Sequence, residues 1–111
     1  MTILEINLRI GKMKVTFTDP AAERMRDIHK FYKCNVSEII ADKIIAKILD
    51  AAKILEVSPW AGQEEFYLKH LGHDHRTIIA GNYKIIYRIE VEEVLITDVF
   101  DARQDPAKMV R

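Results

Sequence analysis

Three apolar segments between His75 and Pro106 constrain the fold of this chain more than any other feature. Gly81-Asn82 separates the first segment from the second, and an acidic turn at residues 90–93 separates the second from the third. Short connections of this kind are typical of neighbouring antiparallel strands. The three segments are residues 75–80, 83–89 and 94–101. They predict a three-stranded antiparallel meander, followed by an exit segment that breaks at the proline.

Two amphipathic helices are predicted upstream of this meander. Thr18 or Asp19 can cap the first helix, and Pro20 fits its first turn because an N–H there has no helical partner. Asn35 or Ser37 can cap the second helix. The apolar stripe of the second helix comprises Ile40, Ile44, Ile48 and Leu55. A helix hairpin must bury such a stripe against the sheet. We therefore expect an α+β fold in which an antiparallel β-sheet packs against an N-terminal α-helix hairpin.

The chain length of 111 residues fits a single domain, residues 1–111, with one modest core. No apolar run approaches the roughly 18 residues of a membrane-spanning helix, and the N-terminus lacks the pattern of an export signal. The single cysteine, Cys34, excludes an internal disulfide and fits a reducing compartment. These features predict a cytoplasmic protein without a membrane partner.

Charge and histidine content give little support for nucleic acid or metal. Basic and acidic residues balance at 17 each, although residues 68–88 form a local basic patch. Three histidines and Asp74 lie within residues 70–75. A zinc site needs about three converging ligands, and no distant cluster of ligands matches the histidines on this predicted loop. We expect no metal and no cofactor.

The N-terminal residues allow two interpretations. Residues 4–10 alternate apolar and polar side chains, as a half-buried strand does, and Gly11-Lys12 suits a tight turn into residues 13–17. Alternatively, the domain begins at Met13 and residues 1–12 form an N-terminal strand extension. An exposed edge strand invites pairing with another chain, so residues 4–10 are a candidate homodimer surface.

The order of these elements resembles that of the RelE/ParE toxins of bacterial toxin–antitoxin systems, over most of residues 13–109. The resemblance rests on the Tyr83-Lys84-Ile85-Ile86-Tyr87 strand, on the exit from Val99 to Pro106, and on the Pro59-x-x-Gly62 break after the second helix. It implies a cytoplasmic toxin that a small cognate antitoxin neutralises by wrapping an extended or helical segment over the sheet and helices. On this interpretation, residues 4–10 are also a candidate for receiving an antitoxin strand.

The two branches of this family make different chemical demands. RelE-like members cut mRNA in the ribosomal A site, whereas ParE-like members share the fold and poison DNA gyrase. Metal-independent RNA cleavage needs side chains that deprotonate the 2′-hydroxyl, neutralise the phosphorane and protonate the leaving oxygen. The resemblance implies Arg76, Lys84 and Arg103 as candidates for a catalytic role, with His75 as an acid or base.

This set of candidates is incomplete for a ribonuclease. Ile78 or Ile79 stands where the strand would carry a second basic residue, and residues 105–111 contain no counterpart of the RelE C-terminal tyrosine. We therefore expect a toxin that arrests growth by binding an essential target, as ParE-like members bind DNA gyrase. A RelE-like ribosome-dependent mRNA endoribonuclease is the alternative. A degenerate, non-toxic binding module is the third interpretation.

Each basic candidate also has a purely structural interpretation. Arg76 and Lys84 can be exposed cross-strand cations on the solvated face of a sheet. Arg103 can bind phosphate, or it can pair with Asp101 or Asp105 and fix the C-terminal segment.

Aromatic residues are expected to serve the core. Alternation along the second meander strand places Tyr83 and Tyr87 on its core face, with hydroxyls that reach the edge. Trp60 is expected to pack below the helix hairpin, and a stacking platform for a base is the alternative. Residues 63–74 are ambiguous between a helical turn and an extended approach to the sheet.

Overall fold

The computed structural model describes residues 12–69, 72 and 74–109 of the chain. The strand predicted at residues 4–10, with its proposed homodimer surface, lies outside these residues. The elements are β1 (Lys14–Phe17), α2 (Asp19–Asn35), α3 (Glu38–Lys53), η1 (Ile54–Glu56), η2 (Pro59–Ala61), β2 (Gln63–Glu64), α4 (Phe66–Lys69), β3 (Arg76–Ala80), β4 (Tyr83–Ile89), β5 (Glu93–Asp101) and η3 (Pro106–Met109).

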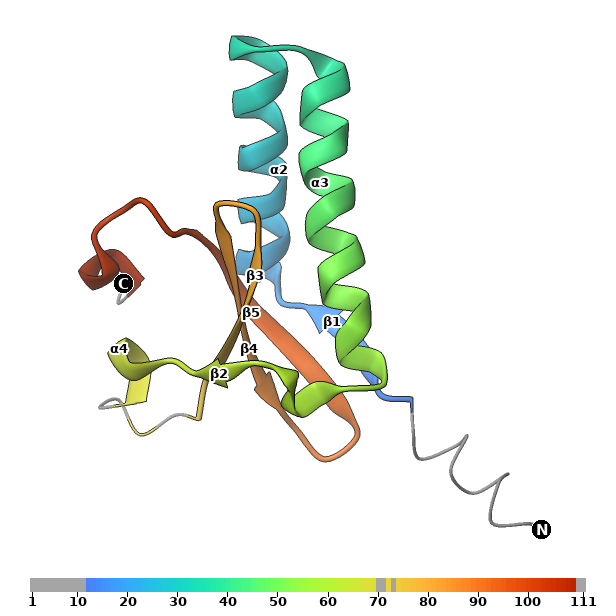
Figure 1. Cartoon of the computed structure of the whole chain (residues 1–111), viewed down its shortest axis with the longest axis vertical. Coiled ribbons are helices and arrows are strands. Elements are labelled where there is room, and N and C mark those ends of the chain that lie inside the picture. The colour runs from blue at the N-terminus through green and yellow to red at the C-terminus, as the bar shows by residue number, and fades with distance from the viewer. Residues whose placement is uncertain (1–11, 70–71, 73, 110–111) are drawn as a thin grey trace, which may run out of the picture.

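The five strands form one sheet in the order β1-β5-β4-β3-β2. β3, β4 and β5 form the predicted antiparallel meander (Figure 1). Gly81 has a φ of +62° in the turn between β3 and β4, a conformation that glycine adopts without a steric penalty. One strand pair differs from the antiparallel expectation, because β1 lies parallel to β5. Parallel neighbours need a long crossover connection, and the helix hairpin with the meander supplies it.

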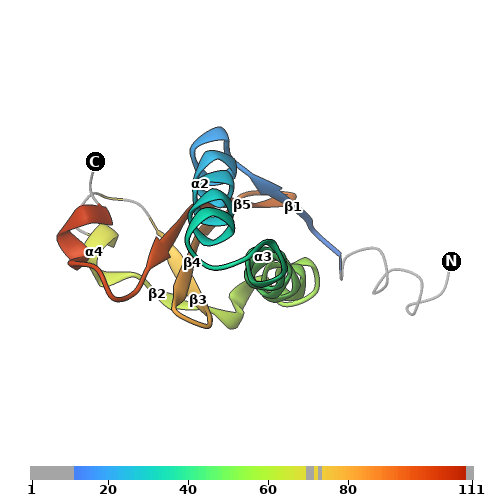
Figure 2. The same ribbon diagram turned by 90° about the horizontal axis from the view of Figure 1, so that it is seen from above.

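The two faces of the sheet are covered by different elements. The face toward α2 and α3 carries the larger core, which contains Tyr83, Ile85 and Tyr87 of β4, as alternation predicted. The opposite face carries a smaller cluster of Leu68, Ile86, Phe100 and Met109. Figure 2 shows α4 and the C-terminal turn together, away from the two long helices.

Both long helices begin at side-chain caps that the sequence predicted as alternatives. The Thr18 hydroxyl caps α2, and the Ser37 hydroxyl accepts a hydrogen bond from the Ile40 N–H at 3.1 Å at the start of α3. The predicted apolar stripe of α3 is only partly buried, since Ile40 remains 37% exposed. The buried side chains of the helix itself are Ala41, Ile48 and Ala52. Two of the three are alanines, which add no bulk where the helix packs.

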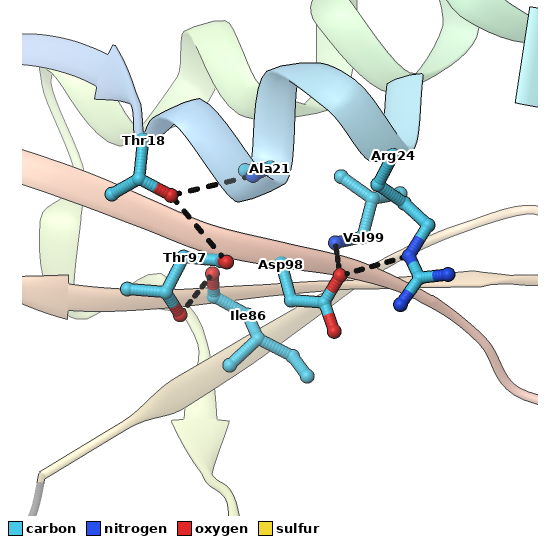
Figure 3. A network of polar contacts seen from close by, with 7 residues as sticks. All are labelled: Thr18, Ala21, Arg24, Ile86, Thr97, Asp98 and Val99. Carbon is cyan, nitrogen blue, oxygen red and sulfur yellow. Dashed lines mark hydrogen bonds and ion pairs between the residues drawn. The ribbon is translucent and has the colours of Figure 1, made fainter. Parts of the chain in front are cut away.

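An irregularity in β5 connects that strand to the start of α2. The pairing between β4 and β5 shifts between Ile86 and Tyr87, which leaves Thr97 as an extra residue on β5. The Thr18 hydroxyl accepts from the Ala21 N–H at 3.4 Å and donates to the Thr97 carbonyl at 3.5 Å (Figure 3). The Thr97 hydroxyl in turn donates to the Ile86 carbonyl at 3.3 Å. The helix cap and the strand irregularity therefore form one hydrogen-bonded network.

An ion pair extends this network along the first turns of α2. Arg24 Nε lies 3.2 Å from Asp98 Oδ1, and the same carboxylate oxygen accepts from the Val99 N–H at 2.8 Å (Figure 3). Hydrogen bonds to charged groups are stronger than those between neutral groups. These contacts fix the position of the helix hairpin over the sheet.

The outer edge of β3 is only partly covered. The Glu65 N–H donates to the His75 carbonyl at 2.9 Å, so the alternation of an antiparallel pair directs the backbone groups of Thr77 and Ile79 away from β4. Ile78 directs its backbone groups toward β4. β2 pairs with β3 as far as Thr77, and Ile79 lies beyond that pairing.

Candidate functional site

Arg76 and Lys84 lie on neighbouring strands but on opposite faces of the sheet. Arg76 is the direct partner of Tyr87, and Lys84 is the direct partner of Ile79. Residues directly opposed in an antiparallel pair place their side chains on the same face. Because Tyr87 belongs to the core under α2 and α3, Arg76 lies on the helix-covered face. Lys84 lies on the other face, so these two predicted site residues do not converge.

Gly62 and Trp60 hold the Arg76 side chain. Arg76 Nη1 donates to the Gly62 carbonyl at 2.7 Å, and its guanidinium carbon lies 4.8 Å from the centroid of the Trp60 ring. A cation at this distance over an indole face is attracted by the negative charge of the ring face. Trp60 itself is 68% exposed, so the expectation that it packs below the helix hairpin is wrong.

The outward position of Trp60 follows from hydrogen bonds on either side of it. The Tyr87 hydroxyl donates to the Pro59 carbonyl at 2.7 Å and accepts from the Gly62 N–H at 2.9 Å. Tyr87 is 0% exposed, and this burial raises the pKa of its hydroxyl. Both flanking backbone groups therefore point inward to the tyrosine, and the indole is left outside.

Glycine is required at position 62 because the Tyr87 hydroxyl and the Thr77 carbonyl leave no room there for a side chain. A Cβ added to Gly62 would lie 2.5 Å from the Tyr87 hydroxyl and 2.7 Å from the Thr77 carbonyl, shorter than real Cβ contacts. The Pro59-x-x-Gly62 pattern thus has a physical basis: its two ends bind one buried tyrosine hydroxyl, and the second end has no room for a side chain.

His75 and Arg76 are the two predicted site residues that share a cavity. This cavity has a volume of about 130 Å³ and is also lined by Trp60, Glu64, Asp74 and Ile89. Two carboxylates therefore lie at the same opening as the two basic side chains. Acidic side chains at this position oppose the approach of a phosphate, since phosphate contacts dominate nucleic-acid affinity.

Lys84 partners a buried carboxylate. Lys84 Nζ lies 3.4 Å from Glu65 Oε2, and the Thr77 hydroxyl donates to the same oxygen at 2.9 Å. Glu65 is 7% exposed, and a charge buried to this extent needs a partner of opposite charge. Sequence reasoning missed Glu65, because a glutamate in an ambiguous polar segment carries no signal of burial.

Arg103 pairs with Asp101, one of the two aspartates predicted for it. Arg103 Nε lies 2.9 Å from Asp101 Oδ1, and Nη2 lies 2.8 Å from Oδ2. The hydrogen bond from Arg103 lowers the pKa of the Asp101 carboxyl. The same carboxylate, together with the Tyr32 hydroxyl, raises the pKa of Arg103.

The Arg103 pair lies beside a further cavity, of about 260 Å³, between α2 and the end of β5. Tyr83 and Tyr32 line it, with the Tyr83 hydroxyl donating to the Tyr32 hydroxyl at 3.4 Å. Burial raises the pKa of Tyr83, and the Tyr32 hydroxyl and the Asp101 carboxylate raise it further. The cavity holds one basic candidate, Arg103, and none of the other three.

The four predicted residues thus occupy three separate places. His75 and Arg76 lie together, Lys84 lies on the opposite face, and Arg103 lies at the end of β5. Within the part of the chain that the structure describes, no group of three or more His, Cys, Asp or Glu side chains could hold a metal ion. Among the same residues, no helix has the length and apolar content needed to cross a membrane.

Comparison with known proteins places this fold in a family. The family described as the ParE toxin of the type II toxin–antitoxin system parDE matches residues 15–106. Among solved structures, the chain is similar to one from a chromosomal ParDE toxin–antitoxin system of P. aeruginosa, with 18% sequence identity and a TM-score of 0.70. That match covers 84% of this chain and 99% of the other. A comparison with curated protein sequences found no match. This chain belongs to the ParE toxin family of type II toxin–antitoxin systems.

Proposed function

We propose that this ParE-type toxin arrests growth in the cytoplasm by binding an essential target, DNA gyrase, without cutting RNA. The observation that carries the proposal is the dispersal of the basic candidates over both faces of the sheet. RNA cleavage without a metal needs a base, an acid and a cation around one phosphate. Arg76 and Lys84, which a ribonuclease would place around that phosphate, lie on opposite faces.

The contacts of these cations support the same proposal. Lys84 and Arg103 each pair with a carboxylate, and Arg76 donates to a backbone carbonyl. A phosphate at Lys84 would lie beside the Glu65 carboxylate, whose negative charge opposes it. His75 beside Arg76 is the observation that favours the RelE-like alternative, since an imidazole can act as an acid or a base.

A cognate antitoxin that neutralises the chain is the second part of the proposal. A neighbouring open reading frame with a DNA-binding N-terminal half is the expected source. Co-expression of its product should restore growth and give a stable complex with this chain. If the chain arrests growth and the product of no neighbouring open reading frame restores it, only the antitoxin part of the proposal is contradicted. If the chain neither arrests growth nor inhibits gyrase while folded protein accumulates, the degenerate binding module becomes the better interpretation.

Incorporation of labelled thymidine and methionine after induction of the chain without an antitoxin tests the target. Thymidine incorporation should fall first, and purified chain should inhibit DNA supercoiling by gyrase. A variant with both Lys84→Gln and Arg103→Gln should remain toxic, provided that thermal melting shows it to be folded. An early fall in methionine incorporation, abolished by these substitutions, would instead support ribosome-dependent mRNA cleavage.

The homodimer surface at residues 4–10 stays a prediction. If this segment pairs two copies, deletion of residues 1–12 should convert a dimer into a monomer in solution. If the segment receives an antitoxin strand, the deletion should weaken antitoxin binding. An unchanged oligomeric state and an unchanged antitoxin affinity would contradict both roles.

A further inference from the structure

Trp60 is largely exposed, although its ring contacts the half-buried Arg76. Trp60 is the single tryptophan of the chain, and 68% of it is exposed. Large aromatic side chains usually bury most of their surface. Here the indole is held outside the molecule by the backbone on either side of it, through the two hydrogen bonds of Tyr87.

Contacts within the chain already place the Arg76 guanidinium against the Trp60 ring. Arg76 is fixed by the Gly62 carbonyl at 2.7 Å and by the Trp60 ring at 4.8 Å, and Gly62 is fixed by Tyr87. Side chains that are already ordered lose little entropy on binding, which raises the affinity of a contact. Tryptophan and arginine are the residue types that most often dominate the energy of protein–protein interfaces.

The surroundings favour a protein over a nucleic acid as the partner. Glu64 and Asp74 line the cavity of about 130 Å³ beside the pair, and their carboxylates oppose phosphates. Arg76 occupies one face of the indole, which reduces the surface on which a base could stack. Ile89 contributes an apolar wall to the same cavity. The cavity therefore presents the apolar wall of Ile89 close to the Arg76 guanidinium, which is a hydrogen-bond donor.

We propose that Trp60 and Arg76 form the contact through which this toxin binds its target protein, at a target surface that presents an apolar side chain beside a hydrogen-bond acceptor. This inference rests on the proposed growth arrest by binding, and it names the surface of the toxin that does so.

Growth arrest by variants at exposed aromatic positions tests this surface. Trp60→Ala should raise the concentration of toxin needed for gyrase inhibition at least about tenfold and should abolish growth arrest. Phe66→Ala is the matched control, because Phe66 is 78% exposed on α4 and does not line the cavity. It should inhibit as the wild type does. Arg76→Gln provides a second, independent change, and thermal melting shows whether each variant is folded.

The outcomes separate this inference from the proposed function. If the wild type arrests growth and folded Trp60→Ala and Arg76→Gln do so equally well, the surface is wrong while the function stands. If the wild type neither arrests growth nor inhibits gyrase, the proposed function fails. Because the chain has one tryptophan, its fluorescence reports on Trp60 alone. Quenching of this fluorescence by an RNA oligonucleotide at micromolar concentration would overturn the protein partner in favour of nucleic acid.

Discussion

Replacement of Tyr87 by phenylalanine should destabilise this protein far more than the loss of one oxygen atom normally does. The Tyr87 hydroxyl donates to the Pro59 carbonyl and accepts from the Gly62 N–H, and the residue is 0% exposed. Phenylalanine preserves the packing of the ring, so the substitution isolates the two hydrogen bonds.

The expected cost follows from what each backbone group loses. The Gly62 N–H is buried and would have no replacement partner, which costs about 1–3 kcal/mol. Pro59 is only half-buried, so water can reach its carbonyl, and that loss is about 0.5–1 kcal/mol. Together these give a decrease of about 1.5–4 kcal/mol in the free energy of unfolding. For a domain of this size, the midpoint of thermal unfolding should fall by about 10 °C.

Urea denaturation of Tyr87→Phe measures this decrease, with Tyr67→Phe as the matched control. Tyr67 is 43% exposed, so water can replace its hydroxyl contacts, and its substitution should change stability by less than about 0.5 kcal/mol. If both variants lose the same small amount of unfolding free energy, the Tyr87 hydroxyl does not stabilise the turn between Pro59 and Gly62. A reduced dependence on urea concentration in Tyr87→Phe would indicate instead that the folded or denatured state had changed.

Three further predictions test other features of the fold. Gly62→Ala should lower the midpoint of thermal unfolding by more than Tyr87→Phe does. The added Cβ would lie 2.5 Å from the Tyr87 hydroxyl and 2.7 Å from the Thr77 carbonyl of β3. Equal midpoints for Gly62→Ala and the wild type would contradict this prediction. Ile79→Pro should remain folded by circular dichroism while Ile78→Pro does not, because only the N–H of Ile78 is directed to β4, and the reverse result would refute the register. The pKa values of Tyr83 and Tyr87 are raised in the folded state, so the contribution of these two tyrosines to stability should be constant below pH about 10 and fall as the pH rises above it. Urea midpoints between pH 8 and 11 should fall less steeply in a variant that lacks both tyrosines, and parallel slopes would exclude this linkage.

The meander and its faces could be predicted because a period of two residues is local information. Alternation alone placed Tyr83 and Tyr87 in the core, and the structure confirms it. The separation of Arg76 from Lys84 was also present in the sequence. A two-residue turn fixes the register so that Arg76 opposes Tyr87, which lies on the face that Lys84 does not share.

Trp60 and Glu65 could not be predicted from local pattern. The exposure of Trp60 depends on Tyr87, which lies 28 positions after Pro59 in the chain. The burial of Glu65 depends on Lys84, 19 positions later. Hydrophobicity alone places a tryptophan inside and a glutamate outside, and in both cases a long-range hydrogen bond reverses that preference. The family resemblance identified the fold, but it could not show that the four basic candidates would be dispersed.

The parallel pair of β1 and β5 has a consequence for how the protein is made. Paired residues of these two strands lie 79 positions apart, so within the described residues β1 has no neighbouring strand until β5 has been synthesised. At about 5–20 residues per second, this interval lasts about 4–16 s. During that time the helix hairpin lacks the completed sheet on which it packs. The native sheet, and any growth arrest that depends on it, can therefore appear only after β5 has been translated.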